Sequence, residues 1–358
     1  MDPLTHAVAG VALSQLVPAP SRGWAALAGI CFAILPDLDY VVILSSRMAY
    51  LKHHRGFTHS LVAMVLFVFL FAGLGRLLGG PRWFRPLVII GFLVLGSHLF
   101  LDWTTSYGTQ LLLPFSRAKL SLDWVFIIDP YLTGLLLAAA LAVFWASGWG
   151  RTLGAACLIL AGAYILLCGF YHRQALNLAH QIFQPQTQEK AKLAALPQPF
   201  SPRRWLLVAA VPGEVRQAFV ELPRWPLVAE MTPPPEIPVR QAARTQFRVP
   251  AAPYQPPDAL EVYLWQAAPS PLSELPPEIK GLLDTYLEFS RFPLLVANDR
   301  HPGGKNLTWL DLRFSVPGRQ IPFVLQAQVD QSGRLAAWRI GGGILPSPES
   351  AGQSPRPG

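Results

Sequence analysis

The scarcity of acidic residues in the first half of the chain is the feature that most restricts its fold. Residues 1–188 contain no glutamate, and their only acids are six aspartates: Asp2, Asp37, Asp39, Asp102, Asp123 and Asp129. Over the whole chain 52% of residues are hydrophobic and 14% are charged, whereas a soluble domain carries about 25% charged residues. We therefore expect this half to be embedded in a membrane, where each retained acid is costly and points to function.

Six apolar segments divide the first 170 residues: 6–17, 23–35, 60–79, 86–101, 130–149 and 152–170. At about 1.5 Å per residue, a segment near 20 residues crosses a hydrocarbon core of about 30 Å, and the first two segments are too short to do so. Those two are expected to form a helical hairpin that turns near residues 18–23 and ends at Pro36. The predicted fold is a mainly α membrane helical bundle of about four spanning helices plus this short N-terminal hairpin.

The character of the chain changes after residue 170. Residues 171–258 are rich in Pro, Gln and Ala and predict an extended linker with short strands. β-rich runs occur at 205–211, 260–266, 307–316, 322–329 and 335–340, and residues 278–289 read as a short amphipathic helix. We expect a membrane domain over 1–170, the linker over 171–258, a small α+β extramembrane domain over 259–345 and a disordered tail over 346–358.

Histidines and aspartates stand at the ends of the early apolar segments. If successive segments alternate in direction, one membrane face receives four groups that are distant in sequence: His6, Asp37 with Asp39, the run His53 to His59, and His98 with Asp102. Imidazole and carboxylate together are the ligands that zinc prefers. The topology therefore predicts a metal site at one boundary of the membrane.

Two of these groups also have a non-functional interpretation. His98 and Asp102 are spaced i and i+4, so on a helix both project from one face and can bind one ion, but they also fit an interfacial histidine with a capping acid. Asp37 and Asp39 repel each other unless a cation neutralises them, but they also fit a solvated turn. The lack of other acids nearby favours the metal interpretation.

The run from His53 to Ser60 carries both bases and hydroxyls. His53 and His54 offer one or two further imidazoles, and Arg55 offers a guanidinium that can clamp a phosphate or carboxylate, although a positive-inside loop gives the same pattern. Gly56 allows a tight backbone approach or a positive φ. Thr58, like Thr5 earlier, is expected to be a helix N-cap that places the next histidine at the positive end of the helix dipole, and the alternative is a helix start with an incidental histidine.

These motifs resemble the YdjM-type membrane-bound metal-dependent hydrolases over roughly residues 1–170. The run His54-Arg55-Gly56-Phe57-Thr58-His59-Ser60 is the most specific element, together with Thr5-His6, Pro36-Asp37-Leu38-Asp39 and His98 through Asp102. The motif order is also similar to that of zinc-dependent phospholipase C enzymes, which implies a phosphodiester substrate by analogy. The resemblance implies that the metal ligands are His6, Asp37, His59, His98 and Asp102, followed by His54 and Asp39.

The function predicted from the sequence is that of an integral membrane hydrolase with one or two divalent ions, zinc being preferred. Asp39 is expected to accept a proton from the attacking water, and Arg55 is expected to hold the anionic group of an ester or phosphoester such as a lipid headgroup. The alternative is a non-catalytic metal-binding scaffold or ion-handling protein, whose C-terminal domain recruits a protein partner that the sequence does not identify.

The net charge of +8 and the pI near 9.6 bear on partners and location. The basic residues are scattered and no nucleic-acid-binding motif is present, so anionic membrane lipids are the expected partners and nucleic acid is not. We expect a prokaryotic plasma (inner) membrane location. The motif face and the C-terminal domain are expected to be cytoplasmic, because six basic residues lie on that side against five arginines on the opposite side; the six are Arg47, Lys52, Arg55, Arg117, Lys119 and Arg173.

Overall fold

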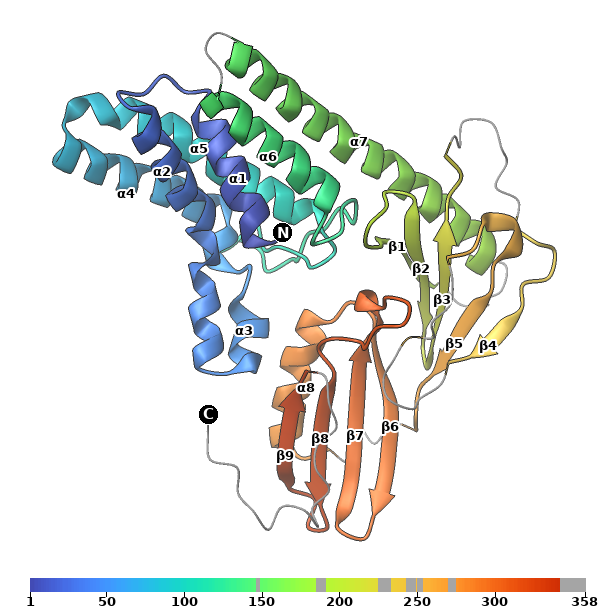
Figure 1. Ribbon diagram of the computed structural model, residues 1–358. Coiled ribbons are helices and arrows are strands. Elements are labelled where there is room, and N and C mark those ends of the chain that lie inside the picture. Colours follow the sequence, from blue (N-terminus) through green and yellow to red (C-terminus); the bar gives the residue numbers. More distant parts are fainter. Residues whose placement is uncertain are drawn as a thin grey trace. The chain divides into compact units, whose positions relative to one another are not determined.

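The computed structural model describes residues 1–145, 149–184, 191–224, 233–242, 249, 254–269 and 275–341. The chain divides into two compact units (Figure 1). The first comprises Met1–Gln174 and Leu196–Arg204, and the second comprises Ala175–Ala195 and the described residues from Trp205 onward. The predicted disordered tail at 346–358 and parts of the predicted linker lie outside the described residues.

The first unit is helical. Its α-helices are α1 (Pro3–Ser14), α2 (Arg22–Ile34), α3 (Arg47–His53), α4 (Leu61–Gly79), α5 (Phe84–Thr104), α6 (Pro130–Trp145) and α7 (Trp149–Phe183), which continues into the second unit. Three short 3-10 helices connect them: η1 (Pro36–Leu44), η2 (Phe57–His59) and η3 (Pro81–Trp83).

Among the described residues, three segments are long and apolar enough to cross a membrane: Leu61–Gly79, Pro81–Thr104 and Trp149–Phe183. A fourth arises if α2 and η1, which meet at a 50° bend, form one broken span. Helix α6, which was predicted to span, has only 16 residues. The prediction of a helical membrane bundle with a short N-terminal hairpin is confirmed.

The hairpin of α1 and α2 is held together by two glycines. A Cβ added to Gly29 would lie 2.3 Å from the carbonyl oxygen of Gly10, and a Cβ added to Gly10 would lie 2.4 Å from the carbonyl oxygen of Gly29. The backbones can approach so closely only because neither residue has a side chain. Helix α2 then packs Phe32 against a core that includes Val68 of α4 and Val94 of α5 (Figure 1).

The helix caps differ from the sequence prediction at two positions. Asp2, not Thr5, caps α1, because its side chain accepts a hydrogen bond from the Thr5 backbone N–H at 3.1 Å. Ser60, not Thr58, caps α4, because its hydroxyl accepts from the Ala63 N–H at 3.0 Å. The predictions that Thr5 and Thr58 cap these helices are therefore wrong. In each case a better-placed acceptor lies two or three residues away.

In its described residues the second unit contains the end of α7, two sheets and one further helix, in agreement with the predicted α+β region. Five strands form one sheet in the order β1-β2-β3-β5-β4: β1 (Lys192–Pro197), β2 (Arg204–Val211), β3 (Glu214–Glu221), β4 (Val239–Gln241) and β5 (Val262–Gln266). Four antiparallel strands form the other in the order β6-β7-β8-β9: β6 (Pro293–His301), β7 (Gly304–Asp311), β8 (Leu325–Asp330) and β9 (Leu335–Ile340). The helix is α8 (Pro277–Phe289). The domain boundaries proposed from the sequence stay predictions.

We expect Gly29→Ala to lower the free energy of unfolding by about 1–3 kcal/mol, because the added methyl group overlaps the backbone of α1. Gly73→Ala in α4 is the matched control, since nothing lies within 4 Å of its added Cβ and alanine favours the helix by up to about 1 kcal/mol. Thermal unfolding of both variants in one detergent measures the difference. An unchanged unfolding temperature for Gly29→Ala would show that the close approach of the two helices is dispensable.

Candidate metal centre

The structure brings together the histidines and aspartates that the sequence placed on one membrane face. They come from five elements of the first unit: His6 from α1, Asp37 and Asp39 from η1, His54 from the C-cap of α3, His59 from η2, and His98 with Asp102 from α5. All of them are buried except Asp37, whose side chain is 10% exposed. Segments almost a hundred residues apart thus converge, as predicted.

Asp102 lies in the middle of the cluster. Its Oδ1 is 3.2 Å from Nε2 of His6, and its Oδ2 is 3.3 Å from Nε2 of His59 and 3.6 Å from Nε2 of His98. The rings of His6 and His98 stack with their centroids 3.7 Å apart. The amino group of Met1 also contacts Oδ1 of Asp102. One carboxylate therefore faces three imidazoles.

The two aspartates of η1 differ in their surroundings. Asp39 accepts hydrogen bonds from His54 Nδ1 at 2.7 Å, from the Thr58 hydroxyl at 2.9 Å and from the Arg55 backbone N–H at 3.1 Å. Asp37 has its Oδ1 3.4 Å from Nε2 of His59, while its buried Oδ2 has no hydrogen-bond partner. Asp39 is therefore held by the protein, and Asp37 keeps a free oxygen.

Three groups of side chains are close enough to share an ion, with ligand atoms within 4.8 Å of one another. They are His6 with His98 and Asp102, Asp37 with His59 and His98, and Asp37 with Asp39 and His54. The groups overlap, because His98 and Asp37 each occur in two of them. The arrangement can hold one ion or two neighbouring ions.

Unsatisfied polar atoms show that these residues fit a cation. Five buried side-chain atoms of the cluster have no hydrogen-bond partner: His6 Nδ1, Asp37 Oδ2, His59 Nε2, His98 Nε2 and Asp102 Oδ2. Such buried atoms cost about 1–3 kcal/mol each when left unpaired. Imidazole nitrogens and carboxylate oxygens are the donors that zinc takes, with no thiolate needed.

The backbone of α2 fixes the orientation of one ligand. His98 Nδ1 donates a hydrogen bond of 2.6 Å to the carbonyl oxygen of Ala33. A carbonyl can only accept, so the proton of the neutral ring is on Nδ1 and the lone pair of Nε2 faces the cluster. The sequence carried no signal for this contact between α2 and α5.

Arg55 lies inside the cluster. It is buried and adopts φ 58°, and its guanidinium contacts Asp102 Oδ1 at 2.9 Å and the Thr105 hydroxyl at 2.9 Å. Its charge lies 4.8 Å from the centre of the Tyr107 ring. In this geometry the arginine positions Asp102, and its predicted role as an anion clamp stays a prediction. Thr105 and Tyr107 were not anticipated from the sequence.

Gly56 and His53, which are close to Arg55 in the sequence, differ in their relation to the cluster. Gly56 does not adopt a positive φ, but a Cβ there would lie 2.7 Å from the carbonyl oxygen of His53, so the tight backbone approach is observed. His53 is exposed and belongs to none of the three groups. The second imidazole considered in this run is therefore outside the cluster.

The pKa of His59, which lies outside the spanning helices, reflects the balance of charge in the cluster. Burial by itself lowers the pKa of this imidazole, but its contacts with Asp102, Asp37 and Asp39 outweigh that effect and raise the pKa to about 10. The buried carboxylates thus require a positive charge among them. Arg55 and the amino group of Met1 supply part of it beside Asp102, and a proton on His59 or a bound cation adds to it.

Two curated proteins are similar to this chain. The chain is 32% identical over 179 residues to the uncharacterized protein YfhP of Bacillus subtilis, which covers 48% of this chain and 53% of that protein. It is 38% identical over 105 residues to the inner membrane protein YbcI of Escherichia coli, which covers 27% of this chain and 57% of that protein. The chain thus spans about half the length of these curated relatives. No solved structure matches it.

The family model described as YdjM inner membrane protein matches residues 1–175, a part that holds the whole histidine–aspartate cluster, the candidate spans Leu61–Gly79 and Pro81–Thr104, and most of Trp149–Phe183. Over residues 1–175 the chain is thus similar to the YdjM family of inner membrane proteins.

Proposed function

We propose that the protein is an integral membrane hydrolase that uses one or two divalent cations, zinc being preferred, to cleave an ester or phosphoester. The observation that carries the proposal is that the ligand atoms of these histidines and aspartates lie within 4.8 Å of one another in three overlapping groups, while five buried polar atoms of the cluster make no hydrogen bond. A structural histidine cluster would satisfy these atoms with hydrogen bonds. Atoms left unpaired in a buried polar site are what a cation site needs.

The ligands in this proposal are His6, Asp37, His59, His98 and Asp102, with His54 next to them. A divalent cation held there polarises a substrate oxygen and makes water nucleophilic near neutral pH. The ring of His98 is pre-oriented by Ala33, and the carboxylate of Asp102 is pre-oriented by Arg55. Such preorganisation lets the ligands bind without rearranging.

Asp39 is the proposed proton acceptor. Its Oδ1 accepts the 2.7 Å hydrogen bond from His54 Nδ1, which holds the carboxylate in a fixed orientation for taking up the proton. Arg55 keeps a buried Nε without a hydrogen-bond partner, and we propose that this N–H contacts an anionic oxygen of the substrate. Asp37, with the most exposed side chain of the ligand set, lies where substrate and water would enter.

A second candidate function is non-catalytic metal binding, as a scaffold or in ion handling. The observation that favours it is the burial of His6, His59, His98 and Asp102, each at most 1% exposed. A site closed to water cannot activate it, whereas a catalytic site keeps an open position. Turnover of a substrate separates the two functions, because metal binding alone is common to both.

We expect Asp102→Asn to lower metal affinity by at least about tenfold, since the amide lacks the negative charge that faces three imidazoles. Asp129→Asn is the matched control. Asp129 is also buried, but it caps α6 by accepting from the Leu132 N–H at 2.9 Å, a role that asparagine fills equally well. Metal content after purification gives the result, and equal content in the two variants would exclude Asp102 as a ligand.

We expect His59→Ala to abolish hydrolysis, and His53→Ala to leave it unchanged, because His53 is an exposed residue of the same loop outside the cluster. Release of nitrophenol from bis(p-nitrophenyl) phosphate and from p-nitrophenyl butyrate distinguishes phosphodiester from carboxylic ester cleavage. If metal is bound but the unmodified protein turns over neither compound nor phospholipid vesicles, the non-catalytic function is the correct one.

A further inference from the structure

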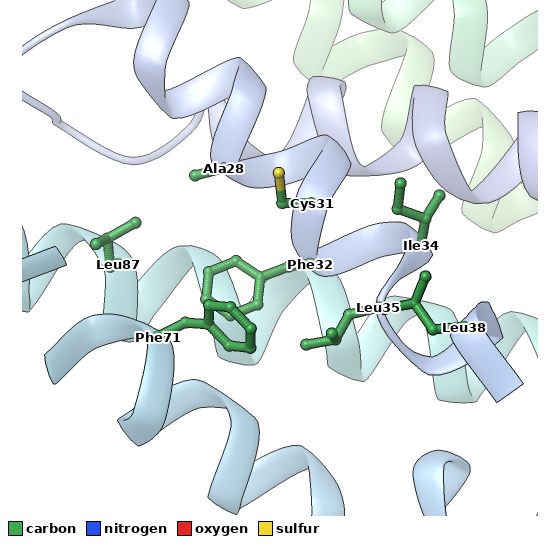
Figure 2. Close-up of a pocket in the computed structure, with 8 residues that line it drawn as sticks. All are labelled: Ala28, Cys31, Phe32, Ile34, Leu35, Leu38, Phe71 and Leu87. Atoms are coloured by element: carbon green, nitrogen blue, oxygen red, sulfur yellow. The ribbon is translucent and has the colours of Figure 1, made fainter. Parts of the chain in front are cut away.

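An apolar pocket lies beside the metal centre. It has a volume of about 330 Å³, opens to the surface and is lined by residues of α2, η1, α4 and α5 (Figure 2). Its lining includes Ala28, Cys31, Phe32, Leu35, Leu38 and Phe71, and no lining residue is charged. The volume is within the range of small-molecule sites, but a polar ligand would find no hydrogen-bonding side chain there.

One short stretch of chain separates the pocket from the metal centre. Leu38 lines the pocket, and its two neighbours in η1, Asp37 and Asp39, belong to the cluster. Ala33, near the end of α2, lies four residues before Asp37, and its carbonyl oxygen accepts the hydrogen bond from His98. The adjacent Phe32 lines the pocket. The pocket and the cluster therefore lie on opposite sides of the junction between α2 and η1.

The depth of the pocket follows from the two spanning helices that line it. Phe71 lies ten residues after Leu61, where α4 begins next to the cluster, which corresponds to about 15 Å along the helix axis. Leu87 lies eleven residues before His98 on α5, or about 16 Å. Both distances are about half of a hydrocarbon core of about 30 Å, so the pocket extends from the site to the middle of a bilayer.

The side chains around the entrance match a lipid environment. The 3-10 helix that carries Asp37 and Asp39 exposes large apolar side chains at Leu38, Val41 and Leu44, which are 61%, 63% and 83% exposed. A run of exposed apolar groups beside buried carboxylates is unfavourable in water and natural at the boundary between headgroups and hydrocarbon. The pocket is thus continuous with a surface that faces acyl chains.

We propose that this pocket binds one acyl chain of a membrane lipid and so places the headgroup linkage of that lipid at the metal centre. The inference rests on the proposed hydrolase function and narrows its substrate to an acyl lipid. Transfer of the chain from bilayer to pocket is a move between two apolar media and yields little affinity. The pocket therefore acts by orientation, holding the scissile group against the ligands of η1.

The test uses the full-length protein in vesicles of phosphatidylethanolamine and phosphatidylglycerol that contain a phosphatidylglycerol with a photoreactive diazirine on one acyl chain. Illumination is expected to label residues 28–38 and Phe71, as located by mass spectrometry. Cys31→Trp fills the pocket from α2 and should reduce this labelling at least fivefold. Leu27→Trp is the matched control, because Leu27 is an exposed residue of α2 that does not line the pocket.

Labelling that is unchanged in Cys31→Trp, or that falls on other helices, would overturn the proposal. The same holds if the pocket segment is crosslinked to a second copy of the chain, since a protein side chain would then be the occupant. Metal content and the rate ratio for long-chain against short-chain phosphatidylglycerol are measured in parallel. Pocket labelling without hydrolysis of any lipid would refute the hydrolase function but not acyl-chain binding, so the two failures are distinguishable.

Discussion

The burial of the Asp102 carboxylate is the constraint on which the membrane unit depends. Asp102 is completely buried near the end of an apolar helix, where an uncompensated charge would cost several kcal/mol. The charge is compensated by Arg55 at 2.9 Å and by three histidines: His6 of α1, His59 of η2 and His98 of the same helix as Asp102. These residues must therefore converge on the Asp102 carboxylate. The close glycine contact with α2 positions α1, and the Ser60 cap at the start of α4 positions the preceding η2. A left-handed backbone conformation positions Arg55.

Much of this site could be predicted from residue types and topology. The i, i+4 spacing of His98 and Asp102 fixes their common face, and alternating spans bring His6, Asp37 and His59 to the same boundary. The supporting contacts could not be predicted. Hydrogen bonds from Thr58 to Asp39 and from His98 to Ala33 depend on how helices pack, and no local pattern encodes them. The caps at Thr5 and Thr58 were predicted wrongly because nearby Asp2 and Ser60 are equally good acceptors.

The fold of the second unit could also be predicted only in part from the sequence. Strands with alternating or strongly apolar sequences, such as β2 and β9, and the amphipathic helix α8 were located from sequence. Strands β1, β3 and β6 were not, because their residues mix alanine, charge and proline and form strands only through pairing with neighbours. Pairing is a tertiary property, so the two sheets within the predicted linker and domain were visible only in the structure.

The central claim is that buried imidazoles and carboxylates hold a divalent cation. X-ray absorption at the edge of the metal that copurifies with the full-length protein tests it most directly. The account predicts about one or two ions per chain with nitrogen and oxygen neighbours at about 2.0–2.2 Å and outer scattering from imidazole rings. Protein purified from metal-replete cells without bound metal would contradict it. So would sulfur neighbours at about 2.3 Å, which would move the site to the cysteines.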